Sequence, residues 1–223
     1  MTEPVAARVA EYWDARSSNF DDEPDHGLSD PVVRDAWMRR LRSWLPAPPA
    51  EVADLGCGTG TLSVLLAGDG YTVRGVDLSR QMIQAARAKA VAAAVNVEFQ
   101  QADAADPPVA PASVDVVLGR HLLWTLPDPH QALATWTRLL RPGGTLLLIE
   151  GHWNQPSSAA DTGDTEVAAA LPWLGGVGGA TLTAAVAPLV HEFAVHDLSG
   201  DPRLWGRPVH DERFALVART ARA

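Results

Sequence analysis

The sequence contains one cysteine, Cys57, among its 223 residues, so no disulfide can form within a single chain. Cysteine this sparse fits a reducing compartment, and we expect an intracellular, cytoplasmic protein. No apolar run reaches the roughly 20 residues that span a bilayer, and the first residues lack the apolar segment of a secretory signal. Neither a membrane protein nor an exported one is therefore expected.

Basic residues are also scarce, because 18 Lys and Arg stand against 27 Asp and Glu and give a formal net charge of −9. A surface of this sign repels a phosphate backbone, which disfavours nucleic acid as a partner. The seven histidines show no metal-binding spacing. The acidic run Asp21–Asp25 lacks a calcium-loop pattern and is interpreted as a solvated loop, so we expect no bound metal.

Apolar residues make up 47% of the chain and charged residues 20%, which indicates a globular protein of one full-sized domain. Helices are predicted over residues 4–16 and 31–45. From residue 51 onward, helices alternate with strands, which are predicted at 51–55, 72–76, 97–101, 114–119 and 145–150. This alternation predicts right-handed crossovers and a doubly wound, mainly parallel sheet.

The alternation stops after residue 150. Residues 151–191 are rich in Gly, Ala and Trp, whereas 193–198 and 213–218 have the pattern of two strands that pair antiparallel at a sheet edge. The predicted fold is therefore α/β and Rossmann-like, with seven strands and an antiparallel last strand. Residues 1–48 form an N-terminal helical lid, residues 49–223 form the core, and residues 151–191 form a cap over the substrate.

The stretch EVADLGCGTG, residues 51–60, joins a strand to a helix through Gly56, Gly58 and Gly60. Glycines let a backbone approach a ligand closely, and a helix start offers unpaired N–H groups. The ligand is either a dinucleotide or another adenosine-bearing molecule. The glycine order differs from G-x-G-x-x-G, and Asp54 would repel a diphosphate but attract an amine.

Two further acids follow neighbouring strands, and open α/β sheets bind ligands at that edge. Asp77 ends the second predicted strand and can accept hydrogen bonds from ribose hydroxyls, while Asp103 follows the third and can accept from an adenine amino group. A ligand with an amine, a ribose and an adenine but no phosphate matches S-adenosylmethionine.

At this point the sequence resembles the class I S-adenosylmethionine-dependent methyltransferases, over roughly residues 10–150. Four motifs carry the resemblance in order: Asp54–Gly60, Gly75–Ser79, Gln101–Ala104 and Leu140–Gly144. It implies S-adenosylmethionine as cofactor, with its contacts made by Tyr12, Asp54, Gly56, Gly58, Gly60, Asp77, Leu78, Met82, Asp103, Ala104 and Arg120. Arg120 alternatively holds a carboxylate of the substrate.

The resemblance further implies direct displacement, in which an N or O atom of a small molecule takes the methyl group. His121 is the candidate general base, and a structural histidine is the open alternative. Candidate substrate contacts are Phe20, His26, Trp124, His152 and Trp153, whereas His191, His196 and His210 are expected at the surface.

The chain has 8 Trp against 4 Phe and 2 Tyr. Trp37, Trp44 and Trp136 are expected in the core, whereas Trp13, Trp124, Trp153, Trp173 and Trp205 are candidates to cover the cofactor. Such aromatic walls suit a flat or cationic acceptor, or else they fill space between cap and sheet.

Three other functions stay open: a non-methylating cyclisation or rearrangement that uses the same cofactor, a nicotinamide-dependent oxidoreductase, and a non-catalytic binding module. A monomer and a homodimer are both compatible with the sequence.

Overall fold

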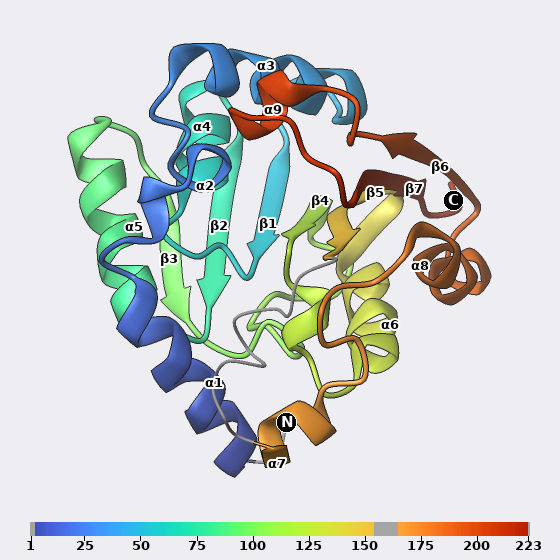
Figure 1. Ribbon diagram of the computed structural model, residues 1–223. Coiled ribbons are helices and arrows are strands. Elements are labelled where there is room, and N and C mark those ends of the chain that lie inside the picture. The colour runs from blue at the N-terminus through green and yellow to red at the C-terminus, as the bar shows by residue number, and fades with distance from the viewer. Residues whose placement is uncertain (1–2, 154–164, 223) are drawn as a thin grey trace.

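The computed structural model describes residues 3–153 and 165–222, and their centre is a seven-stranded sheet of order β3-β2-β1-β4-β5-β7-β6 (Figure 1). Strands β1 to β5 pair in parallel, and β7 runs antiparallel to both β5 and β6. The strands are β1 (Glu51–Leu55), β2 (Thr72–Asp77), β3 (Glu98–Gln101), β4 (Val114–Arg120), β5 (Leu140–His152), β6 (Glu192–Asp197) and β7 (Glu212–Arg219). The predicted fold class is therefore confirmed.

The helices begin where the sequence offers capping residues. Asp30, Ser79 and Asp128 each accept a hydrogen bond from a backbone N–H two or three residues ahead. The helices are α1 (Glu3–Arg16), α2 (Pro24–Gly27), α3 (Pro31–Trp44), α4 (Thr61–Gly68), α5 (Arg80–Ala92), α6 (Pro129–Leu139), α7 (Thr165–Ala170), α8 (Gly179–Val186) and α9 (Pro202–Trp205), with 3-10 turns η1 (Phe20–Asp22), η2 (Leu123–Thr125) and η4 (Ala187–Leu189).

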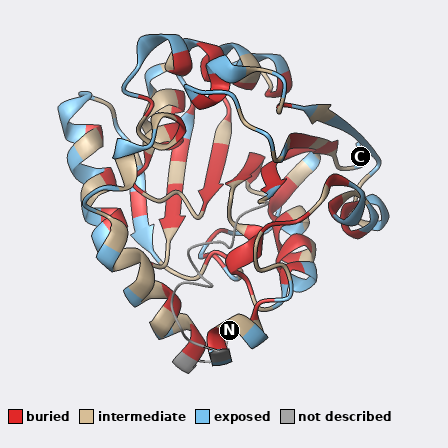
Figure 2. Cartoon of the chain, viewed as in Figure 1, coloured by how far each residue is buried: buried red, intermediate tan, exposed pale blue. Residues whose placement is uncertain are grey.

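The sheet separates two apolar layers. Along β5, Leu146 and Leu148 pack in one cluster with helices α6 and α8, whereas Leu147 and Ile149 pack in another with α3 and α4. Successive side chains of a strand point to opposite faces, which is why one apolar run fills both layers. Buried residues accordingly concentrate on the central strands, while the edge strand β6 is largely exposed (Figure 2).

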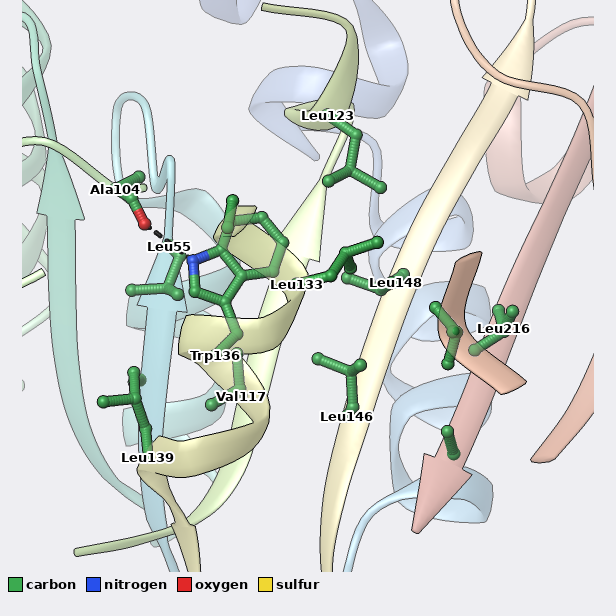
Figure 3. Close-up of a cluster of buried hydrophobic side chains, with 14 of the residues drawn as sticks. Leu55, Ala104, Val117, Leu123, Leu133, Trp136, Leu139, Leu146, Leu148 and Leu216 are labelled. Carbon is green, nitrogen blue, oxygen red and sulfur yellow. Dashed lines mark hydrogen bonds between the residues drawn. The ribbon is translucent and has the colours of Figure 1, made fainter. Parts of the chain in front are cut away.

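Three tryptophans lie in these layers as predicted, because Trp37 and Trp136 are 0% exposed and Trp44 is 4% exposed. The Trp136 indole N–H donates to the Ala104 carbonyl at 2.7 Å, amid the leucines of one layer (Figure 3). The Trp37 indole donates to the Leu204 carbonyl at 2.7 Å on the other face. Both contacts tie a helix to a distant loop or helix and satisfy the polar end of a large apolar side chain.

The structure differs from the sequence-based prediction in two segments. The loop 17–30 contains η1 and α2, and Asp25 within it is 6% exposed, so the interpretation of Asp21–Asp25 as a wholly solvated loop was wrong. Strand β5 begins at Leu140, directly after α6, and passes through Gly143 at φ +76°. In the described ranges, no helix combines the length and apolar character needed to cross a membrane.

An acid is buried at the end of β5, where the Glu150 side chain is 0% exposed. Its Oε1 accepts hydrogen bonds from the backbone N–H groups of Leu122 and Leu123, each at 3.0 Å. Burial raises the pKa of Glu150 to about 7, because removal from water disfavours the charged form more than these two donors favour it. Glu150 thereby fixes the segment that follows β4.

We expect Trp136→Phe to lower the free energy of unfolding by about 2–4 kcal/mol, since it leaves the Ala104 carbonyl unpaired and opens a cavity. Urea denaturation measures the loss. Trp173→Phe is the matched control, because Trp173 is only half-buried and should lose clearly less. Equal losses in the two variants would contradict the role given to the Trp136 hydrogen bond.

A second prediction concerns pH. The folded state holds the Glu150 proton up to a pKa of about 7, whereas an unfolded chain releases it near 4.5, so stability falls as pH rises through this window. Relative to Glu150→Gln, the wild type should lose on the order of 3 kcal/mol between pH 4.5 and 7 and nothing further above it. Urea denaturation at several pH values measures this, with the exposed Glu11→Gln as control. A difference that does not change with pH would refute the assignment.

Candidate functional site

A cavity of about 860 Å³ lies at the carboxyl ends of the parallel strands. Helix α1 runs past these strand ends (Figure 1). Of the predicted site residues, the cavity is lined by Phe20, His26, Gly56, Gly58, Asp77, Leu78, Met82, Asp103, Ala104, Arg120, His121, Trp124 and Trp153. Predicted site residues from the N-terminal segment, from the strand ends and from the segment after β5 thus line one cavity.

The glycine turn after β1 forms the floor of the cavity. The Cys57 N–H donates to the Val76 carbonyl of β2 at 3.0 Å, and Gly58 follows at φ +54°. A Cβ on Gly58 would lie 3.5 Å from the Phe20 ring, at ordinary van der Waals distance, so a side chain there would fill the space between the turn and that ring. By contrast, a Cβ on Gly60 would lie 2.7 Å from the Phe99 ring, which shows that Gly60 serves packing.

Asp77 connects this turn to the next helix. One carboxylate oxygen accepts from Gly58 N–H and the other from Ser79 N–H, each at 2.8 Å. Burial raises the pKa of Asp77, while these two donors oppose the rise. A carboxylate has about four lone-pair positions, so two of them stay available to hydroxyl groups in the cavity.

Asp103 and Ala104 line the same cavity after β3. The Asp103 carboxylate accepts from the Ala105 N–H at 2.9 Å, which fixes its direction at the strand end. The Ala104 carbonyl is held by Trp136. This edge of the cavity therefore presents an acceptor group, as a bound adenine amino group requires.

Four predicted site residues are not among those that line the cavity: Tyr12, Asp54, Gly60 and His152. Asp54 is 3% exposed, accepts from the Ser63 hydroxyl of α4, and has a pKa raised to about 6 by burial. Tyr12 lies under the Arg16 guanidinium, 3.6 Å from its ring centroid, while Trp13 beside it faces the cavity. His152 is exposed. The roles predicted for these four residues stay predictions.

Acids attach the predicted lid to the side of the cavity formed by the glycine turn and α5. The Asp14 carboxylate accepts from Ser79 Oγ and from Gln81 N–H at the start of α5. The Asp21 carboxylate accepts from the Thr59 hydroxyl at 2.6 Å and pairs with the Lys89 ammonium at 2.8 Å. These contacts hold α1 and η1 over the glycine turn.

The end of β4 projects Arg120 and His121 into the cavity. The Arg120 guanidinium donates to the Asp25 carbonyl at 2.7 Å and so is already engaged with the lid. His121 has φ +54°, an uncommon value for a side chain with a Cβ, and its N–H donates to the Ile149 carbonyl at 2.9 Å. Burial, with Arg120 beside it, lowers the pKa of His121 well below its usual value, so the ring is neutral at pH 7.

The His121 ring lies among aromatic side chains. Its centroid is 4.8 Å from that of Trp153 and 6.1 Å from that of Trp205. His26 lies 6.3 Å away and stacks on Phe20 at 4.3 Å. Burial also lowers the pKa of His26, and the neighbouring Asp25 opposes that change. This half of the cavity is suited to a flat molecule.

Sequence reasoning missed one wall of the cavity, which is formed by residues 207–211 and Arg213. The Arg213 guanidinium lies 4.5 Å from the Trp153 ring and 4.7 Å from the Trp205 ring, and it pairs with Asp211 at 2.8 Å. Arg207 pairs with Glu23 of the lid at 3.0 Å. No local sequence pattern marks this loop, since only the β6–β7 hairpin brings it to the site.

Two expectations about the cavity walls were wrong. Trp205 is 1% exposed and belongs to the core, and Trp173 packs against His130 instead of lining the cavity. His210 is exposed, as the sequence predicted, and it also lines the cavity. Of the described residues in 151–191, Trp153 alone lines it, and residues 154–164 of the predicted cap lie outside the described ranges.

Comparison with known proteins agrees with this geometry. Residues 53–148 match the methyltransferase domain family. The chain is 37% identical to the ubiquinone biosynthesis O-methyltransferase of Thiobacillus denitrificans over 152 residues, which cover 65% of this chain and 62% of that protein. The Xanthomonas campestris enzyme of the same name is 33% identical over 64% of this chain and 57% of its own length. The chain thus matches less than two thirds of each relative.

Solved structures share the fold at lower identity. Geranyl diphosphate C-methyltransferase from Streptomyces coelicolor, solved with S-adenosyl-L-homocysteine, aligns with a TM-score of 0.71 and 18% identity over 99% of each chain. The cyclase SpnF aligns with a TM-score of 0.67 and 19% identity over 85% of this chain and 81% of its own. At these identities the alignments support the fold alone. Together with the match of residues 53–148 to the methyltransferase domain family, the two curated relatives, the glycine turn and the acids at the strand ends make this chain similar to the class I S-adenosylmethionine-dependent methyltransferases.

Proposed function

We propose that the protein transfers the methyl group of S-adenosylmethionine to an oxygen atom of a flat small molecule. The proposal rests on one observation, which is that a single cavity has a polar half and an aromatic half. One half is polar and offers Gly58, Asp77 and Asp103 at neighbouring strand ends, while the other is walled by Trp13, Trp153 and the His26–His121 pair. Cofactor and acceptor would meet where these halves join.

The cofactor half is complementary to the parts of S-adenosylmethionine. Asp77 would accept hydrogen bonds from the ribose hydroxyls, Asp103 from the adenine amino group, and the glycine turn at Gly56 and Gly58, which lines the cavity, would contact the methionine part. Leu78 and Met82 supply apolar contacts beside the adenine. Asp54, enclosed beneath the turn, would contribute its negative charge at a distance rather than by contact.

The acceptor half supports oxygen as the methylated atom. The two relatives compared above are named O-methyltransferases, and the wall of Trp rings favours a planar molecule such as a phenol. The sulfonium already activates the methyl carbon, so the protein would act mainly by positioning the acceptor and excluding water. The lid, attached through Asp14 and Asp21, would close the cavity for this purpose.

The prediction that His121 is the general base stays a prediction. The neutral His121 ring has a lone pair that can accept a proton, but its lowered pKa makes it a weaker base. A non-methylating cyclisation is the second candidate, and likeness to the cyclase SpnF in fold does not favour it over methyl transfer.

The cofactor assignment predicts that Asp77→Asn lowers the affinity for S-adenosylmethionine and for S-adenosylhomocysteine by roughly 100-fold or more, since two hydrogen bonds to a charged acceptor are weakened. Isothermal titration measures both affinities. Asp69→Asn is the control, because Asp69 pairs with Arg42 after α4 and does not line the cavity. An affinity within twofold of wild type in Asp77→Asn would refute the ribose assignment.

The acceptor assignment is tested with S-adenosylmethionine that carries a ¹³C-labelled methyl group and with matched phenols, anilines and thiols. We expect an O-methyl resonance and one equivalent of S-adenosylhomocysteine for each methyl transferred. Methylation of nitrogen, sulfur or carbon would refute the oxygen assignment. An altered acceptor without release of S-adenosylhomocysteine would instead support the cyclisation alternative.

A further inference from the structure

Asp25, His26 and His121 place three potential metal-ligating atoms together on the acceptor side of the cavity. One atom from each side chain lies within 4.8 Å of the other two, and the Asp25 Oδ2 to His26 Nε2 distance is 3.7 Å. The residues come from two segments about 95 positions apart, so the fold alone creates the cluster. All three residues line the cavity.

Two of these atoms are buried and lack a hydrogen-bond partner among the described residues. Asp25 Oδ2 and His121 Nε2 have no hydrogen-bond partner among residues 3–153 and 165–222, and neither is accessible to solvent. An unpaired buried polar atom costs about 1–3 kcal/mol, so a native protein normally supplies a partner, such as an ion or an ordered water. A carboxylate oxygen can only accept, which makes a shared cation a suitable partner for this pair of atoms.

Separate contacts hold the three side chains facing one another. The left-handed backbone of His121 is fixed by its hydrogen bond to the Ile149 carbonyl. The His26 ring stacks on Phe20 and is hydrogen-bonded to its backbone. The Asp25 backbone is held by the Arg120 guanidinium. Supporting contacts of this kind orient the ligands in metal sites.

Two imidazoles and one carboxylate form a donor set of catalytic zinc sites, in which a fourth position stays open to water or substrate. Zn–N bonds of about 2.0–2.1 Å place two ligand atoms roughly 3.3 Å apart, so small side-chain rotations must draw this cluster inward. Because all three residues line the cavity, the open position would face its interior.

The charges around the cluster partly oppose and partly favour a cation. The Arg120 guanidinium, which acts on both histidines, and the Arg213 guanidinium, which acts on His121, oppose it. The carboxylates of Asp25 and Glu23, which act on His26, favour it. Arg213 is paired with Asp211 and Glu23 with Arg207, so the attraction for a divalent ion would come mainly from Asp25 and the two imidazole ligands themselves.

We propose that Asp25, His26 and His121 bind one divalent transition-metal ion of the zinc type, whose open position takes an oxygen of the acceptor. The second part rests on the proposed function, whereas ion binding does not. The sequence shows no metal-binding spacing because the ligands come from distant segments. Asp25 and His26 lie in α2, and His121 follows β4. The proposal therefore replaces the sequence-based expectation of no metal.

The test uses the full chain after dialysis against a chelator, with Co²⁺ as the probe because its visible absorption reports nitrogen and oxygen ligands. We expect one Co²⁺ per chain, displaced by Zn²⁺. His26→Ala, His121→Ala and Asp25→Asn should each weaken binding by more than about 100-fold, since loss of a mere supporting contact costs 10–100-fold. His191→Ala, at an exposed position, is the control and should bind like wild type.

Circular dichroism and S-adenosylmethionine titration show whether each variant is folded. Absence of stoichiometric Co²⁺ binding by the wild type, or binding that survives in folded His26→Ala and His121→Ala, would overturn the site. Methyl transfer that continues unchanged in the chelated wild type, in a protein that does bind Co²⁺, would overturn only the role of the ion toward the acceptor. Failure of methyl transfer in every metal state would instead count against the proposed function.

Discussion

The two hydrogen bonds to the Asp77 carboxylate are the interaction on which the cofactor half of the site depends. They join the N–H groups of Gly58 and Ser79, and so fix the turn after β1 against the start of α5. Both donors favour the charged carboxylate, whereas burial disfavours it, and the balance leaves the pKa of Asp77 raised. In the proposed function, the group that organises the turn would also offer its remaining lone pairs to the cofactor, so a substitution of Asp77 would change the turn as well as the ligand contact.

The predicted lid contacts the same glycine turn and the start of α5, but its contacts are partly exposed. Asp14 reaches the residues that start α5, and Asp21 reaches Thr59 and Lys89 beside the glycine turn. Partly exposed polar contacts of this kind contribute little stability each, so the lid can open without unfolding the sheet beneath it. A ligand that fills the cavity would add apolar contacts to Trp13 and Phe20 and would favour closure. If the N-terminal segment acts as a lid, access to the site would be controlled by contacts that are individually weak.

The sequence predicted the sheet, the helices that alternate with its parallel strands and the residues at the strand ends because those features are local. Gly56 and Gly58 follow β1, Asp77 ends β2 and Asp103 follows β3, so their place in the sheet follows from the alternation of elements. Asp25 and Arg213 were missed for the opposite reason. Asp25 is buried only because α2 folds against the end of β4, and Arg213 reaches the cavity through an antiparallel hairpin. No sequence pattern within either segment predicts those tertiary contacts.

The residues predicted from local sequence are those proposed to bind the cofactor, whereas the residues missed are those proposed to contact the acceptor. The cofactor contacts lie on strand ends that are fixed by backbone pairing and by buried leucines on both faces of the sheet. The acceptor walls come from the lid, from β4 and from residues 207–213, and these segments meet through side chains such as Arg207 and Glu23. Replacement of a side chain in such a wall changes the shape and charge of the cavity at little cost to the core. Arg120 and His121 are the exception, because Arg120 ends a core strand, His121 follows it, and both line the cavity. Under the proposed function, their chemistry would constrain every acceptor that the walls admit.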